Sequence, residues 1–280
     1  MLVTLFRLLS KLPLSWMHAI GSLLGWVVYW TAPTYRRRMR ENMERAGFAK
    51  QLSQAVREAG KNIAELPFVW FASEDRLCRA AILEDWELIE RTLAEGKGLI
   101  FLTPHLGCFE VTAQVVATRM PLTVLYRPPR KDALKPLLEG ARGRAKLSLA
   151  PANLSGVRIL LKTLKQGGMV GMLPDQVPQQ GEGVWAEFFG RQAYTMTLPA
   201  KLQQMTGAPI LVAYGERVPA GFRIRIARLP QVPAGTPEEQ ARFINTAMEK
   251  LIAHCPEQYF WSYNRYKAPA GAAAPAKEPR

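Results

Sequence analysis

The sequence predicts an α/β fold in which a mixed central sheet is flanked by helices and preceded by an N-terminal membrane-anchoring helix. Two observations support this prediction. Short apolar runs that read as buried strands alternate with helical patterns from residue 98 onward. Ahead of them, the run from Leu12 to Tyr35 contains no Lys, Arg, Asp or Glu. We therefore expect an anchor over residues 1–35, an α/β domain over residues 36–266 and a disordered tail over residues 267–280.

The uncharged N-terminal run is long enough to cross a membrane. As a helix it would extend about 36 Å, whereas the hydrocarbon core of a bilayer is about 30 Å thick. Its aromatic residues lie toward both ends, as in interfacial belts: Trp16, Trp26, Tyr29, Trp30 and Tyr35. The basic residues Arg36, Arg37 and Arg38 follow directly and favour a body on the cytoplasmic side. A helix lying in the interface and a buried soluble helix are the alternatives.

The next part of the chain leads into a strand-to-helix turn. Residues 36–93 show a helical pattern throughout, and residues 98–102 read as a short buried strand. Pro104 ends that strand, because proline cannot donate to a sheet ladder. A helical pattern then runs from Phe109 to about Arg119. The sequence thus predicts a turn at residues 103–108.

The remaining elements alternate in the same way. Strands are predicted at residues 122–126, 169–173, 208–214 and 222–227. Helices are predicted at residues 131–146, 156–168 and 236–254, and another, capped by Thr195 or Thr197, ends near Thr206. Residues 181–185 form a glycine-rich loop. Strands that alternate with helices in this order favour a sheet covered by helices.

His105 and Glu110 are the candidate catalytic pair. A neutral imidazole can take a proton from a hydroxyl group, and a carboxylate on its other ring nitrogen fixes the tautomer. Residues five apart on one helix point about 140° apart, so contact requires His105 on the turn and Glu110 in the first helical turn. Gly107 would give the backbone freedom for that turn. A lone histidine is more often structural, but ligands gather at strand ends in α/β folds, which favours catalysis.

Polar residues also follow two further predicted strands. Arg127 leaves the strand at residues 122–126, and its planar fork suits a phosphate or the charge on an acyl-transfer intermediate. Asp175 and Gln176 follow the strand at residues 169–173. Asp175 can orient an arginine or bind substrate. Each of these residues has an ordinary alternative as a surface or turn residue.

Composition limits the partners. The chain has 280 residues, with 37 Lys and Arg against 23 Asp and Glu, giving a net charge of +14. This charge predicts an anionic partner, such as a phospholipid surface, a phosphorylated substrate, an acidic protein or a nucleic acid. The three cysteines, Cys78, Cys108 and Cys255, are widely spaced, which suits a reducing compartment and gives no metal-binding motif. Cys108 lies close to His105, where it is either a nucleophile or a small apolar filler.

Taken together, these motifs resemble the late acyltransferases of lipid A biosynthesis, the lauroyl/myristoyl type within the wider glycerolipid acyltransferase group. The resemblance covers nearly the whole chain, to about Tyr266. The motifs on which the resemblance rests are Thr103–Glu110, Tyr126–Pro128, Leu173–Gln176, Gly183–Gly190, Thr195 and Gln258–Trp261. One departure is visible, because many members carry a histidine where this chain reads Tyr263–Asn264.

The resemblance implies acyl transfer from an acyl carrier protein thioester to a hydroxyl of a Kdo-bearing lipid A precursor. It also implies an inner-membrane enzyme whose catalytic domain lies on the cytoplasmic face. Carried over by position, His105 is the base and Glu110 its partner. The substrate-binding residues would be Arg127, Asp175, Gln176, Phe189, Gly190 and Thr195. No cofactor is expected, because the thioester is already activated.

Rival functions stay open at this point. An acyltransferase of the same group can act on a lysophospholipid or another glycolipid. A basic, membrane-tethered binding protein without catalysis would not depend on His105 or Glu110. Nucleic-acid binding is compatible with the charge, but the sequence has no zinc spacing or clear recognition helix. A serine hydrolase would need a Gly-x-Ser-x-Gly elbow, which the sequence lacks.

Overall fold

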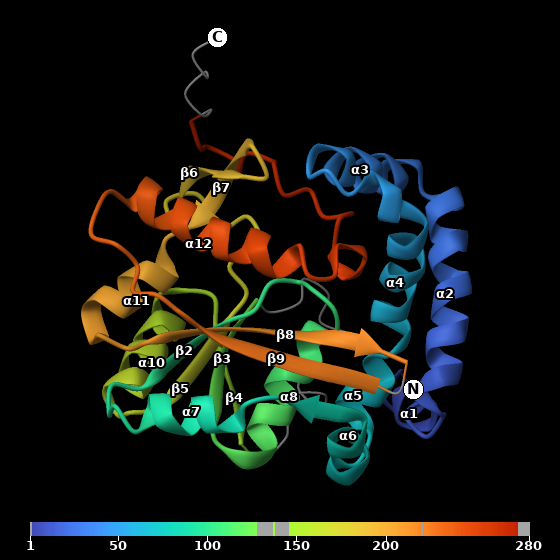
Figure 1. Ribbon diagram of the computed structural model, residues 1–280, viewed down its shortest axis with the longest axis horizontal. Helices are drawn as coiled ribbons and strands as arrows, with labels where there is room; N and C mark the ends of the chain where they lie inside the picture. The colour runs from blue at the N-terminus through green and yellow to red at the C-terminus, as the bar shows by residue number, and fades with distance from the viewer. Residues whose placement is uncertain (1, 128–136, 138–145, 220, 274–280) are drawn as a thin grey trace.

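The computed structural model describes residues 2–127, 137, 146–219 and 221–273 (Figure 1). Its main sheet runs in the order β1-β9-β8-β2-β5-β3-β4. These strands are β1 (Ala81–Leu83), β2 (Leu99–Leu102), β3 (Leu122–Tyr126), β4 (Leu147–Pro151), β5 (Met169–Met172), β8 (Ile210–Val218) and β9 (Gly221–Leu229). A separate hairpin consists of β6 (Gly183–Phe188) and β7 (Arg191–Met196).

The main sheet is mixed, as the sequence predicts. Strands β8, β2, β5, β3 and β4 are parallel to one another, whereas β9 runs antiparallel to β8 and β1 runs parallel to β9. The antiparallel step is a tight connection between β8 and β9, which pair from Ile210 with Leu229 to Val218 with Gly221. The parallel strands need crossover segments, and among the described residues these contain helices at Phe109–Arg119, Leu154–Lys165 and Leu198–Thr206.

The helices fall into an N-terminal group and a group that covers the sheet. The first group comprises α1 (Leu2–Leu9), α2 (Leu14–Thr31), α3 (Pro33–Arg45), the 3₁₀ turn η1 (Ala49–Gln51), α4 (Leu52–Ala64), α5 (Leu66–Phe71) and α6 (Glu74–Ala80). The second comprises α7 (Trp86–Leu93), α8 (Phe109–Arg119), α10 (Leu154–Lys165), α11 (Leu198–Thr206), α12 (Pro237–Ile252) and the 3₁₀ turn η3 (Pro256–Gln258).

Alternate residues of the central strands belong to different hydrophobic clusters. Ile100 and Leu102 lie in the cluster shared with α10, α11 and α12. Leu99 and Phe101 lie in the cluster shared with α7 and α8. This alternation follows from the two-residue repeat of a strand, and all four residues of β2 are buried. The sheet is therefore covered on both faces. In Figure 1, α2, α3 and α4 stand at one end of it and α10 and α11 at the other.

The strand order explains where the polar residues meet. β5 lies between β2 and β3, and Leu102 pairs with Met172. Because the three strands are parallel, their carboxyl ends lie at one edge of the sheet. His105, Asp175 and Arg127 follow those ends within three residues. The fold thus brings residues far apart in sequence to one place.

Most predicted elements are confirmed, and the differences are local. β1, β4 and the β6–β7 hairpin were not predicted, because they are short or contain polar and glycine residues. The expected helix at residues 131–146 lies almost entirely outside the described residues. In the expected tail, Gly271 accepts a hydrogen bond from Gln180 and Ala273 accepts one from Trp185, and residues 274–280 are not described.

The expected membrane-spanning helix is not confirmed. α2 ends at Thr31, and Pro33 begins the separate helix α3. Among the residues that the structure describes, no helix is long and apolar enough to cross a membrane. One face of α2 is also buried in the protein, at Met17, Gly21, Gly25 and Tyr29. An uncharged run alone does not reveal such one-sided burial.

Glycines bring α2 and α4 into unusually close contact. A Cβ atom on Gly60 of α4 would lie 1.9 Å from the Gly21 oxygen and 2.5 Å from the Gly25 nitrogen, both in α2. A Cβ atom on Gly25 would lie 2.1 Å from the Val56 oxygen. These neighbours are backbone atoms, so a side chain there must push the helices apart.

Gly60→Ala should therefore destabilise the protein, because overpacking costs about 1–3 kcal/mol. The higher helix propensity of alanine, worth about 1 kcal/mol over glycine, offsets only part of this cost. The free energy of unfolding, measured in urea, checks this. Gln54→Ala, at an exposed position of the same helix, should change it by less than about 0.5 kcal/mol. A stability of Gly60→Ala equal to or above wild type would contradict the close contact.

Candidate active site

The turn after β2 requires a glycine at residue 107. Gly107 has a φ of +59°, and a Cβ atom there would lie 2.0 Å from the Gly215 oxygen. The neighbouring Cys108 amide donates to that oxygen at 2.7 Å. The positive φ at Gly107 agrees with the backbone freedom that the sequence predicted there, and the backbone of β8 lies directly against the turn.

Asp175 holds His105 by two hydrogen bonds. The His105 backbone N–H donates to Asp175 Oδ2 at 2.8 Å, and His105 Nδ1 lies 2.8 Å from Asp175 Oδ1. The Asp175 side chain is 1% exposed and that of His105 is 14% exposed. A carboxylate oxygen can only accept, so Nδ1 carries the proton and Nε2 presents its lone pair. This is the tautomer that a general base needs.

The environment of Asp175 keeps it ionised. Burial alone would raise the pKa of Asp175, but the electrostatic interaction with a protonated His105, the two hydrogen bonds from His105 and the nearby Arg265 outweigh burial and lower that pKa. Burial and the contact with Asp175 raise the pKa of the Tyr259 phenol well above its usual value. A negative charge is thus held beside the imidazole, where it stabilises an imidazolium.

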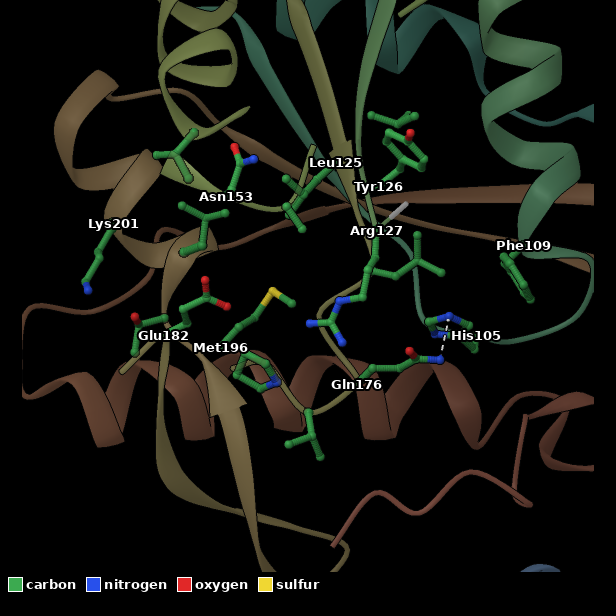
Figure 2. Close-up of a pocket in the computed structure, with 18 of the residues that line it drawn as sticks. His105, Phe109, Leu125, Tyr126, Arg127, Asn153, Gln176, Glu182, Met196 and Lys201 are labelled. Carbon is green, nitrogen blue, oxygen red and sulfur yellow. Dashed lines mark hydrogen bonds between the residues drawn. The ribbon is translucent and has the colours of Figure 1, made fainter. Parts of the chain in front are cut away.

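Gln176 covers the other ring nitrogen. Its Nε2 atom lies 2.9 Å from His105 Nε2 (Figure 2). The amide nitrogen can only donate, so it binds the lone pair that a base would use. A substrate hydroxyl that reaches His105 must therefore take the place of the Gln176 amide.

The carboxylate on the imidazole is Asp175, which corrects the expectation that Glu110 has this role. Glu110 lies in the first turn of α8, where its Oε2 accepts a hydrogen bond from Trp70 Nε1 at 3.2 Å. The physical reason is the strand order, which sets the end of β5 beside the end of β2. Glu110 still lines the same cavity as His105.

That cavity has a volume of about 520 Å³. His105 and Gln176 lie at one end and Glu182 and Lys201 at the other (Figure 2). Arg127 extends into the space between them. The wall is mostly apolar and includes Phe109, Val124, Leu125, Leu147, Val157, Leu173, Val177, Met196 and Leu198. Such a cavity can hold an apolar chain with its polar end at the imidazole.

Four predicted substrate-binding residues are not among those that line this cavity: Asp175, which instead binds the His105 ring, and Phe189, Gly190 and Thr195. Phe189 and Gly190 form the turn of the β6–β7 hairpin, with φ values of +47° and +69°. The Phe189 ring packs against Trp261, with ring centroids 5.6 Å apart. Thr195 is fully buried, and its hydroxyl accepts hydrogen bonds from Asn245 and Arg265. Phe189, Gly190 and Thr195 thus lie in the β6–β7 hairpin, and their predicted role in substrate binding stays a prediction.

Other cavity residues were missed by the sequence analysis. Asn153 follows β4, and its side chain accepts a hydrogen bond from the Gly156 amide at the start of α10. An asparagine ahead of a helical pattern was the available signal. Lys201 and Glu182 gave no signal, because they come from α11 and from the loop before β6. The described residues contain no group of three or more His, Cys, Asp or Glu side chains placed to hold a metal ion.

Comparison with known proteins gives the family. The family model described as bacterial lipid A biosynthesis acyltransferase matches residues 1–268. The chain belongs to this family. It is therefore an acyltransferase of lipid A biosynthesis, as the motifs around His105 and Asp175 indicated.

Individual members of the lipid A acyltransferase family are similar over most of the chain. The palmitoleoyltransferase of lipid A biosynthesis from Escherichia coli K12 is 25% identical over 80% of this chain and 74% of its own length. The lauroyltransferase from the same organism is 26% identical over 78% and 72%. A lipid A biosynthesis acyltransferase from Haemophilus influenzae is 29% identical over 62% and 55%.

Cys108 is placed as a filler in this lipid A acyltransferase. It is 2% exposed, and burial, with the charge of Glu65, raises the pKa of its thiol well above the usual value. A thiol that stays protonated is a poor nucleophile.

Cys108→Ala should therefore keep acyl transfer within a few-fold of wild type, because no covalent enzyme intermediate depends on this thiol. The rate of product formation checks this. Mass spectrometry after iodoacetamide treatment of the native protein should find Cys78, which is exposed, modified before Cys108. Loss of turnover in a folded Cys108→Ala protein would contradict the role of Cys108 as a filler and indicate that its thiol acts as a nucleophile.

Proposed function

We propose that this protein transfers a fatty acyl chain from an acyl carrier protein thioester to a hydroxyl of a Kdo-bearing lipid A precursor. The observation that carries the proposal is the imidazole of His105, oriented by Asp175 at the end of an apolar cavity. The family and the similarity to a lauroyltransferase and a palmitoleoyltransferase support this choice of acyl chain and acceptor.

The proposed reaction has two steps around one tetrahedral intermediate. His105 Nε2 takes the proton of the acceptor hydroxyl as the oxygen attacks the thioester carbonyl. The intermediate then collapses, the carbon–sulfur bond breaks, and the imidazolium returns the proton to the leaving thiolate. No cofactor enters this scheme, because the thioester supplies an activated acyl group.

Other cavity residues have roles that fit their position. Arg127 extends into the cavity, where its guanidinium can stabilise the oxyanion or a phosphate of the acceptor. Gln176 leaves Nε2 when the hydroxyl binds, and its amide then lies beside the reacting carbonyl as a second donor. Glu110 lines the same cavity and can accept a hydrogen bond from a second hydroxyl of the acceptor. Asp175 stays beneath the imidazole.

We further propose that α1 and α2 lie on the cytoplasmic surface of the inner membrane. Large apolar side chains are exposed along them: Leu2, Leu5, Leu8, Trp16, Ile20, Leu23, Leu24, Val27, Val28 and Trp30. Arg36, Arg37 and Arg38 follow in α3, where they can bind lipid phosphates. An interfacial helix with one face buried in the protein fits these observations. The net charge of +14 suits the lipid, the acidic carrier and the phosphorylated acceptor alike.

His105→Ala should lower kcat by about 10²–10⁴-fold, because a general base contributes this much. Asp175→Asn should cause a loss of similar size, since an amide cannot hold the imidazole in the same tautomer. Glu110→Gln should lose less than Asp175→Asn. The assay uses acyl carrier protein thioester with the Kdo-bearing precursor, and with lysophosphatidic acid as a competing acceptor.

Circular dichroism spectra should show that each of these variants is folded. Full turnover in His105→Ala would end the assignment of the base. A greater loss in Glu110→Gln than in Asp175→Asn would return the orienting role to Glu110. A preference for lysophosphatidic acid would replace the proposed acceptor and leave the proposed base intact.

Replacing Leu23 and Val27 together by Glu should weaken binding to vesicles of phosphatidylethanolamine and phosphatidylglycerol by tenfold or more. These side chains are 70% and 55% exposed, and each apolar side chain of this size is worth about 1.5–3 kcal/mol when buried. Sedimentation with vesicles measures this. Met205→Glu, on α11 and 62% exposed, is the matched control and should bind as wild type does. Equal binding by all three proteins would remove α2 from the lipid contact.

A further inference from the structure

A buried ion pair that the proposed chemistry does not use lies beside the catalytic turn. The side chains of Arg217 in β8 and Glu65 ahead of α5 are 3% and 1% exposed. Arg217 Nε lies 2.8 Å and 3.0 Å from the two Glu65 oxygens, and Arg217 Nη2 lies 2.7 Å from Oε1. Burial alone would raise the pKa of Glu65, but the charge of Arg217 and the hydrogen bonds from His18 and Arg217 lower it to about 2. The pair is therefore ionised at neutral pH.

This ion pair reaches the turn through one peptide carbonyl. Arg217 Nη2 also donates to the Gly107 oxygen at 2.9 Å, and Asn62 Nδ2 of α4 donates to the same oxygen at 3.1 Å. The Gly107 amide donates to the Gln258 oxygen at 3.0 Å. The Gln258 side chain binds both the N–H and the carbonyl of Arg217, at 2.8 Å and 3.0 Å. Gly107, two residues after His105, is thus held through both its N–H and its carbonyl.

Helix α2 joins the same group of side chains. His18 Nε2 lies 2.9 Å from Glu65 Oε2, and a ring nitrogen that faces an ionised carboxylate donates to it. His18 is 14% exposed, whereas Trp16 and Ile20 on the outer side of α2 are 63% and 50% exposed. One helix therefore offers an apolar face to the surroundings and a hydrogen bond to the ion pair.

Stability alone is a weak reason for such a pair. Desolvation of two charges is costly, and apolar side chains of similar volume are often as stabilising. What an arginine adds is direction, because its planar fork fixes two acceptors at once. Here Nη2 binds both Glu65 and the Gly107 carbonyl, while Nη1 lies 3.4 Å from Glu58 Oε2.

We propose that His18, Glu65 and Arg217 are positioning residues that hold the catalytic turn in register with α2. They act through the Gly107 peptide, which sets the approach of His105 to the acceptor hydroxyl. None of the three is among the residues that line the cavity. This proposal rests on the proposed function of His105 as general base.

The test compares His18→Ala with His18→Gln. The alanine removes the donor to Glu65, whereas the amide nitrogen of glutamine reaches about as far as Nε2 and donates in its place. His18→Ala should lower kcat by about tenfold to a hundredfold with little change in KM, since a small misplacement of a reacting group has an effect of this size. His18→Gln should restore most of kcat. Ser22→Ala is the matched control, because the Ser22 hydroxyl donates to the His18 carbonyl within α2.

A second readout does not depend on catalysis. Hydrogen exchange of the Gly107 and Cys108 amides should be faster in His18→Ala than in wild type, and unchanged in His18→Gln and Ser22→Ala. Faster exchange with unchanged kcat would show that loosening the turn does not affect catalysis. That result would refute the positioning role and argue against His105 as the general base. Unchanged exchange together with unchanged kcat would overturn the relay through Glu65 and Arg217.

Thermal unfolding shows whether each variant is folded, so that a loss of activity is not mistaken for a loss of structure. If His18→Ala loses its folded structure, Arg217→Lys gives the same test, because an ammonium keeps the charge beside Glu65 but lacks the planar fork that also binds the Gly107 carbonyl. It should lower kcat and speed exchange at Gly107 and Cys108. Wild-type values of both in a folded Arg217→Lys protein would refute the proposal.

Discussion

The site depends on the double contact between His105 and Asp175. One carboxylate accepts from the backbone N–H of His105 and from its ring, each at 2.8 Å, so the turn and the ring orientation are fixed together. This contact requires β2 and β5 to be neighbouring strands whose carboxyl ends lie in the same register. The parallel pairing of Leu102 with Met172 provides that arrangement, and β3 on the other side of β5 brings Arg127 to the same edge.

The sequence revealed the strand ends but not their order. His105, Arg127 and Asp175 were found because each follows an apolar run, which strand periodicity exposes. The partner of His105 was missed because β5, although about 70 residues later in the chain, is inserted between β2 and β3. Glu110 is near in sequence, yet α8 carries it to Trp70. Local patterns cannot supply a long-range neighbour of this kind.

Side-chain contacts also decide what an apolar or polar run becomes. Phe189 and Gly190 were predicted only as substrate-binding residues, but both adopt positive φ in a tight hairpin, a conformation that few residues other than glycine accept. The uncharged run in α2 resembled a membrane span, but Gly21 and Gly25 press one face of it against Gly60. The sequence shows hydrophobicity and the helical repeat, whereas the partner helix decides which face is left exposed.

Gln176 gives the resting site a further property. Its amide donates to the His105 nitrogen that the proposed reaction uses, so this position is filled before the proposed acceptor arrives. An amide suits this position because it leaves the imidazole neutral and able to accept, whereas a carboxylate there would need a proton from the ring. Exchange of one donor, the amide, for another, the acceptor hydroxyl, changes the free energy by only about 1 kcal/mol, the net worth of a single hydrogen bond. In the proposed reaction, water must compete with the same amide for this nitrogen, which would disfavour hydrolysis of the thioester relative to attack by a well-placed hydroxyl.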